Sequence, residues 1–204
     1  MENKYLYIVF SSTPYRVGKC IRRFTGEEYN HLSISLEESL IPMYGFARRY
    51  YHTPFYGGFV QESLSRYCVN GETAHIKICR LPITREQYDF LQHKLSAMYA
   101  QREHYLYNHL SLITVPFGRL IPVKDAYICV EFGVKILHEM GIDLNPRKYY
   151  SVGDVEKILE PYAFYTGPIP EGTYDEAYYQ EHPLPHPTLT TLRSVLALLP
   201  RLGA

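Results

Sequence analysis

Apolar and polar residues alternate along two short segments of the chain. Residues 31–36 read HLSISL and residues 74–81 read AHIKICRL, and both have the two-residue period of a half-buried strand. Residues 5–11, YLYIVFS, form a short aromatic and β-branched run that is typical of a buried strand. Residues 42–48 and 57–62 can return beside residues 31–36. The pattern therefore predicts an antiparallel meander.

Two other segments have apolar residues at helical spacing. Residues 14–24 predict a helix with Pro14 in its first turn, where proline is tolerated. Its expected apolar face consists of Val17, Cys20, Ile21 and Phe24. Thr84 and Gln87 have the spacing of a capping box and precede apolar residues at helical intervals, so a second helix is expected there.

A third helix is predicted over the segment YICVEFGVKILHEMG, residues 127–141, with Cys129 in its first turn. Asp125 is a candidate N-cap, because its short side chain can accept from free backbone N–H groups. His138 falls in the last turn, and Gly141 fits the residue just beyond the end.

The remaining segments are less regular. Residues 107–123 are apolar but contain Pro116 and Gly118, which indicates an irregular connector over a core. The chain is rich in proline and glutamate from about residue 168, so we expect a domain over residues 1–168 and a tail over 169–204. The tail ends in LTTLRSVLALLPRL, a short amphipathic helix expected to dock on the domain or on a partner.

Composition excludes several classes of function. Lysine and arginine total 21, as do aspartate and glutamate, so the formal net charge is zero, and no basic stripe suggests nucleic acid as a partner. No apolar run approaches the ~18 residues of a membrane span, and the first apolar run is too short for a signal peptide. We expect a soluble, cytoplasmic protein without a transmembrane segment.

Cofactor chemistry is not indicated either. The four cysteines, Cys20, Cys68, Cys79 and Cys129, include no pair with Cys-x-x-Cys spacing, so free thiols are expected. The histidines lack metal-ligand spacing, and the chain has neither a Gly-x-Gly-x-x-Gly motif nor a P-loop. The prediction is therefore a protein with no metal and no other cofactor.

Cys129 and His31 are the candidates for chemistry. The start of a helix carries partial positive charge and free N–H groups, which favour a thiolate, and a nearby imidazole can take and return the proton. The backbone N–H of Cys129 could also face an oxyanion. A structural role is the alternative, because cysteine is among the most buried residue types and His31 could be an ordinary strand-end histidine.

The segments YNHLSISL, MYGFARR, PFYGGFVQE and YICVEFGVKIL, in this order, resemble the permuted NlpC/P60 superfamily, across roughly residues 5 to 165. The resemblance implies an α+β, circularly permuted papain-like fold in which an antiparallel sheet packs on the cysteine-bearing helix. It also implies Cys129 as the nucleophile and His31 as the base. The superfamily includes peptidoglycan amidases, lipid acyltransferases and presumed lipid amide or ester hydrolases.

Two departures from this pattern concern polar residues. The helix has Glu131 where such proteins commonly have Gln, and a carboxylate close to the thiol would disfavour a thiolate. The strand after the histidine, residues 42–48, offers no carboxylate or amide to orient the imidazole. Glu62 is the expected substitute, with a solvated strand end as its alternative. Tyr127 is expected to lend a hydroxyl to the cleft, with interface packing as its alternative.

The predicted function is thiol-dependent hydrolysis or acyl transfer on an amide or ester bond of a small-molecule, lipid or peptide substrate. Glu131 and the missing polar residue favour a rival, a non-catalytic binding module that retains the papain-like cleft. A second rival is a protein that recruits partners through its tail.

Overall fold

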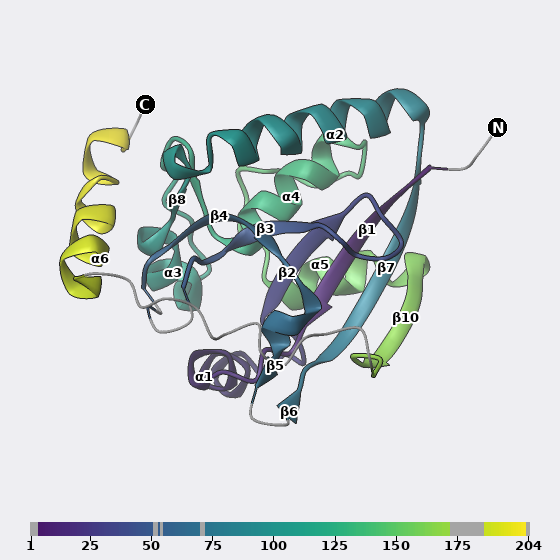
Figure 1. The fold of residues 1–204 in the computed structure, drawn as a ribbon, viewed down its shortest axis with the longest axis horizontal. Coiled ribbons are helices and arrows are strands. Elements are labelled where there is room, and N and C mark those ends of the chain that lie inside the picture. The colour runs from purple at the N-terminus through teal and green to yellow at the C-terminus, as the bar shows by residue number, and fades with distance from the viewer. Residues whose placement is uncertain (1–3, 51–52, 54, 70–71, 172–185, 203–204) are drawn as a thin grey trace.

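The computed structural model describes residues 4–50, 53, 55–69, 72–171 and 186–202 of an α+β fold built on one eight-stranded sheet (Figure 1). The strand order is β10-β7-β1-β2-β3-β4-β8-β9. These strands are β1 (Lys4–Ser11), β2 (His31–Ser35), β3 (Met43–Arg48), β4 (Gly57–Glu62), β7 (His75–Ile83), β8 (Leu106–Tyr107), β9 (Ala126–Tyr127) and β10 (Ala163–Pro168). β5 (Cys68–Val69) and β6 (Glu72–Thr73) form a separate pair.

Six α-helices surround this sheet within the described residues. They are α1 (Arg16–Thr25), α2 (Arg85–Ala100), α3 (His109–Thr114), α4 (Cys129–Glu139), α5 (Val152–Ile158) and α6 (Pro187–Leu196). The predicted capping box of α2 is present, with Thr84 accepting from the backbone N–H of Gln87 and Gln87 accepting in return.

The predicted meander is confirmed for β2, β3 and β4, but residues 74–81 do not continue it, because β7 pairs with β1 and not with β4. β2, β3 and β4 are consecutive antiparallel neighbours, with Ile34 opposite Tyr44 and Gly45 opposite Val60. β1 lies between β2 and β7, antiparallel to both. β8 and β9 then add a parallel pair at one edge, so the whole sheet is mixed. The local alternation of apolar residues gave no sign of this pair, because each strand has only two residues.

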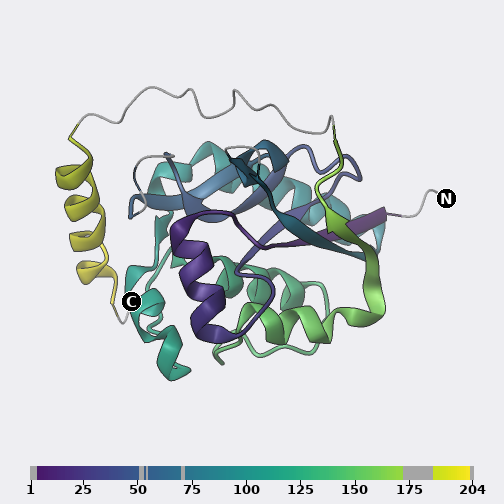
Figure 2. The ribbon, with the colours of Figure 1, turned by 90° about the horizontal axis from the view of Figure 1, so that it is seen from below.

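The main core lies between one face of the sheet and the helices α2, α4 and α5. Leu32, Ile34 and Phe46 of the sheet are fully buried there against Phe132 of α4. α4 approaches β2 closely at Gly133, where an added Cβ would lie 2.5 Å from Leu32 Cδ2. Figures 1 and 2 show α4 and α5 together on this side of the sheet. A helix seated this way brings its N-terminus to the start of β2.

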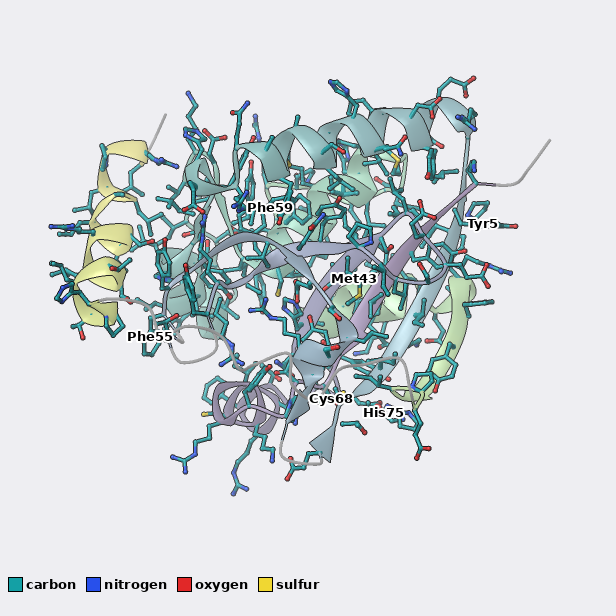
Figure 3. The ribbon with its side chains drawn as sticks, viewed as in Figure 1. Tyr5, Met43, Phe55, Phe59, Cys68 and His75 are labelled. Carbon is teal, nitrogen blue, oxygen red and sulfur yellow. The ribbon has the colours of Figure 1, made fainter. Side chains whose placement is uncertain are left out.

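A second core covers the opposite face of the sheet. It gathers Tyr7, Met43 and Ile76 with Tyr67 from the 3-10 helix Leu64–Tyr67 and with Cys68. Met43 and Cys68 are labelled in Figure 3. The strands of this region are therefore covered on both faces, which explains why all five residues of β2 are buried.

The expected apolar face of the first helix is wrong. α1 begins at Arg16, after Pro14, and both Cys20 and Phe24 are exposed, Phe24 to 73%. The helix approaches its neighbours instead through Gly18, where a Cβ would lie 2.1 Å from the hydroxyl of Thr13. The helix thus contacts its neighbours closely at Gly18, while Cys20 and Phe24 of the expected apolar face stay exposed.

The predicted end of α4 is confirmed, but its predicted N-cap is wrong. The helix starts at Cys129, and its N-cap is Ile128. Asp125 is therefore not the N-cap; it has a positive φ of 55°, and its carboxylate accepts from the imidazole of His104 at 2.9 Å. Gly141 lies just beyond the helix with φ 88°, as predicted.

The end of the chain returns to the body of the protein. Leu198 is fully buried with Leu106, Val123 and Ala126 at the β8–β9 edge, and Leu202 bridges to Val123. α6 lies at the opposite side of the molecule from β10 in both ribbon views (Figure 2). Residues 172–185 of the predicted tail lie outside the described residues.

Candidate active site

The start of α4 brings Cys129 to His31, the first residue of β2. Cys129 and His31 line the same cavity and interact electrostatically, and both residues are more than nine-tenths buried. The contact follows from two local features that the sequence contains. The strand pattern begins at His31, and Gly133 allows α4 to lie against Leu32.

Glu62, at the end of β4, lies against the other side of the imidazole. His31 Nε2 is 3.0 Å from Oε1 of Glu62 and 3.1 Å from its Oε2. An ionised carboxylate only accepts, so Nε2 carries the proton and donates. Nδ1 is then the ring nitrogen left for the thiol. The predicted contact between Glu62 and His31 is therefore present; the catalytic roles of these residues stay a prediction.

Glu62 is itself held by two hydroxyl groups. Ser33 Oγ donates to Oε1 at 3.1 Å, and the hydroxyl of Tyr67 donates to Oε2. Arg66 Nε lies 4.0 Å from Oε2. Only 4% of Glu62 is exposed, so its carboxylate has lost most of its hydration. These partners replace the hydrogen bonds that water would have made.

Gly45 makes room for this arrangement. It lies on β3, between the strands of His31 and Glu62, and a Cβ added there would lie 2.3 Å from Glu62 Oε1. The strand that carries no orienting side chain thus lets the carboxylate of the next strand reach across it.

The electrostatics of the pair favour its charged form. Burial alone would raise the pKa of Glu62, but the His31 imidazole, Arg66 and Tyr67 lower it to about 2. Burial alone would also lower the pKa of His31, but Glu62 and the Cys129 thiol raise it to about 10. At neutral pH the imidazole is therefore positive.

The thiol opens into two adjoining cavities. The first, of about 140 Å³, is lined by Cys129, His31, Tyr107 and His109, with Phe55 at its wall. Figure 3 shows Phe55 on the side of the molecule that carries α6. The second cavity, of about 560 Å³, is mostly apolar and runs from Cys129 along α1, including the exposed Phe24. Cys20, Ile21 and Phe24 of the apolar stripe of α1 therefore line this cavity and are not part of the core.

The place predicted for Tyr127 needs correction. Its hydroxyl accepts from Lys135 at 2.9 Å, its ring packs on Phe46, and it does not line either cavity that Cys129 lines. The alternative of packing at an interface describes it better. Tyr107, its partner in the β8–β9 pair, lines both cavities. Burial is the main cause of the raised pKa of Tyr107, and its interactions with Cys129, Glu131 and Glu62 add to the rise.

Glu131 is directed toward the backbone and away from the cleft. Its carboxylate accepts from the N–H of Ile128 at 2.7 Å and from Ser111 Oγ at 2.8 Å. It lines neither cavity around Cys129. Burial raises its pKa to about 7, although these hydrogen bonds act against the rise. Glu131 thus stabilises the first turn of the helix that carries the thiol.

Comparison of the chain with family models, with curated proteins and with solved structures found no match. Among the residues the structure describes, no group of three or more His, Cys, Asp or Glu side chains is placed to hold a metal ion. In the same residues, no helix has the length and apolar character needed to cross a bilayer.

Four residues near the site escaped the sequence analysis: Ser33, Tyr67, Tyr107 and His109. Ser33 had the clearest signal, because it shares the strand face of His31 in an alternating segment. Tyr67, Tyr107 and His109 sit in a 3-10 helix, a two-residue strand and a six-residue helix. Elements this short carry no periodicity from which a side-chain direction can be read.

Proposed function

We propose that this protein is a thiol-dependent hydrolase or acyltransferase of the permuted papain-like class, acting on an amide or ester bond. The observation that carries the proposal is that Glu62 is hydrogen-bonded to His31, which lines the same cavity as Cys129 and interacts with it electrostatically. A carboxylate that fixes the imidazole tautomer, with the other ring nitrogen toward the nucleophile, is the arrangement of a catalytic triad.

The reaction would proceed in two steps through an acyl-enzyme. The Cys129 thiolate attacks the carbonyl carbon, and the N–H groups at the start of α4 stabilise the oxyanion. The His31 imidazolium gives its Nδ1 proton to the leaving amine or alcohol, and the carbon–heteroatom bond breaks. Neutral His31 then takes a proton from water, or from another acceptor, as that molecule attacks the thioester. Cys129 leaves as the thiolate, and Glu62 stays ionised throughout.

The rival reading, a non-catalytic module, rested on two sequence features. The absence of a polar residue on the strand of Gly45 is compensated by Glu62, which reaches the imidazole from β4. The carboxyl group of Glu131 accepts from the backbone N–H of Ile128 and does not line the cavities around Cys129. Neither feature now favours a site without chemistry.

The test combines thiol labelling with turnover. At pH 6 iodoacetamide should modify Cys129 quickly, and p-nitrophenyl acetate should give an acyl adduct on Cys129 in mass spectrometry. His31→Ala should slow the labelling at least tenfold. The control is His75→Ala, which removes a surface histidine paired with Glu28 at 3.1 Å and should change nothing.

Two outcomes would overturn the proposal. One is a Cys129 that reacts no faster than a free thiol at the same pH. The other is ester hydrolysis that survives Cys129→Ala.

A further inference from the structure

The larger cavity beside Cys129 has no ligand assigned to it by the proposed reaction. Its volume is about 560 Å³, within the range of about 300–1,000 Å³ that is usual for ligand pockets. Both Cys129, which is 7% exposed, and Phe24, which is 73% exposed, line it. The cavity therefore connects the buried thiol with the protein surface along α1.

The walls of this cavity are mostly apolar. The apolar lining residues come from α1, from the region of α3 and from the starts of α4 and α5: Ile21, Phe24, Leu112, Val115, Ile128 and Val152. Surface of this kind favours alkyl groups, because their transfer out of water is favourable and needs no hydrogen bond.

Three polar residues of the lining are already hydrogen-bonded within the protein. Asn30 accepts from the backbone N–H of Thr13 at 2.9 Å and donates to its hydroxyl at 2.8 Å. The carboxylate of Glu27 accepts from the N–H of Gly153 at 3.1 Å, and Ser151 Oγ accepts from the first turn of α5 at 3.0 Å. These contacts leave few polar partners for a ligand, so apolar surface decides what binds.

The position of His31 indicates which part of the substrate occupies this cavity. In the proposed reaction the His31 imidazolium gives its proton to the leaving group, so the leaving group must lie beside His31. His31 lines the smaller cavity, of about 140 Å³, and does not line the larger one, whereas Cys129 lines both. The leaving group therefore belongs in the smaller cavity. The acyl group, bonded to Cys129 in the intermediate, belongs in the larger one.

We propose that the larger cavity binds the acyl group of the substrate, and that this group is a long apolar chain while the leaving group is small. The inference rests on the proposed function. A cavity of about 150 Å³ holds a six-carbon ring, so about 560 Å³ accommodates a chain of roughly ten carbons or more. A peptide acyl group would bring amide groups that find few partners against these walls.

Esters that differ only in chain length test this on the full chain. The substrates are the p-nitrophenyl esters of acetic, hexanoic and decanoic acid, each used below its aggregation concentration, and the rate of Cys129→Ala is subtracted. The value of kcat/KM should rise at least about thirtyfold from acetyl to hexanoyl, against roughly 200-fold for complete burial of four CH₂ groups. The decanoyl ester should react at least as well as the hexanoyl ester.

A second pair places the chain in the leaving group. S-ethyl and S-octyl thioacetate carry the same acyl group, and their cleavage is followed by chromatography. Because a long leaving group finds no matching cavity beside His31, S-octyl thioacetate should gain no more than about twofold over S-ethyl thioacetate.

Two variants alter the larger cavity alone, since Val115 and Phe24 do not line the smaller one. Val115→Phe fills part of the cavity and should move the preferred acyl chain from decanoyl to a shorter one. Phe24→Glu places a charge at an exposed position of the lining and should lower the ratio of decanoyl to acetyl hydrolysis severalfold. Phe90→Glu is the matched control, because Phe90 is an exposed residue of α2 that lines neither cavity; its chain-length series should equal that of the wild type.

Three outcomes would overturn the inference while leaving the proposed function intact. They are a Cys129-dependent rate that does not rise with acyl length, an equal gain from a long leaving group, and an unchanged ratio of decanoyl to acetyl hydrolysis in Phe24→Glu. The last result decides the matter if Val115→Phe lowers the Tm. Hydrolysis that does not need Cys129 would instead overturn the proposed function.

Discussion

Replacing Glu62 with glutamine removes one negative charge from the side of His31 and keeps the shape of the side chain. At the observed 3.0 Å between His31 Nε2 and Glu62 Oε1, two unit charges attract by about 5 kcal/mol at an effective dielectric constant of about 20. One pKa unit corresponds to about 1.4 kcal/mol. Burial lowers the pKa of His31, and the charge of Glu62 is large enough to be the main cause of the net rise from 6.5 to about 10.

The expected result for Glu62→Gln is a fall in the pKa of His31 by at least about 2 units, because the thiol retains part of the stabilisation. Nitrogen chemical shifts of protein labelled on histidine, followed from pH 5 to 11, measure this directly, and His31→Ala identifies the signal. Glu72→Gln, at an exposed glutamate paired with Lys19, is the matched control. A midpoint that stays near 10 in Glu62→Gln would refute the reasoning.

The same pair fixes how stability depends on pH. His31 has a raised pKa, so its contribution to the free energy of unfolding is complete below pH 6.5 and is lost as the pH rises through about 10. Glu62 has a lowered pKa, so its contribution is complete above pH 4.5 and is lost as the pH falls through about 2. In urea unfolding, the difference in unfolding free energy between the wild type and Glu62→Gln should be largest between pH 4.5 and 6.5. A difference in unfolding free energy that does not change with pH would contradict this.

Three further predictions follow from single positions. Limited alkylation at pH 6 should modify Cys129 before the exposed Cys20, and mass spectrometry showing the reverse order would count against an activated thiol. Gly45→Ala should displace the Glu62 carboxylate and slow alkylation of Cys129 severalfold; an unchanged rate would mean that the carboxylate moves freely. Gly133→Ala should cost about 1–3 kcal/mol of unfolding free energy through overpacking, measured in urea, and no loss would show that the helix contact is loose.

Much of the fold could be predicted because its central strands carry strong local patterns. The alternating segment 31–36 and the short strands that follow it pair with their neighbours in sequence, which is the simplest antiparallel connection. The edge strands β8 and β9 could not be predicted in the same way. Their two-residue pairing depends on chain segments that meet only in the folded protein.

The candidate site was predicted where its residues begin or end a regular element. His31 starts a strand, Cys129 starts a helix and Glu62 ends a strand, so the direction of each follows from a periodic neighbour. Tyr127 lies in a two-residue strand, where the direction of the hydroxyl depends on tertiary contacts with Lys135.

The packing of Leu198 has a consequence for the edge of the sheet. β9 is an edge strand, and such strands pair readily with other chains unless something covers them. The bridge between Val123 and Leu202, with Leu198 buried beside Ala126, provides that cover. A chain cut before residue 186 would expose this edge directly beside the helix of Cys129. Such a truncated protein should self-associate. A change in its activity would therefore reflect the uncovered edge of β9 as well as any loss of partner binding.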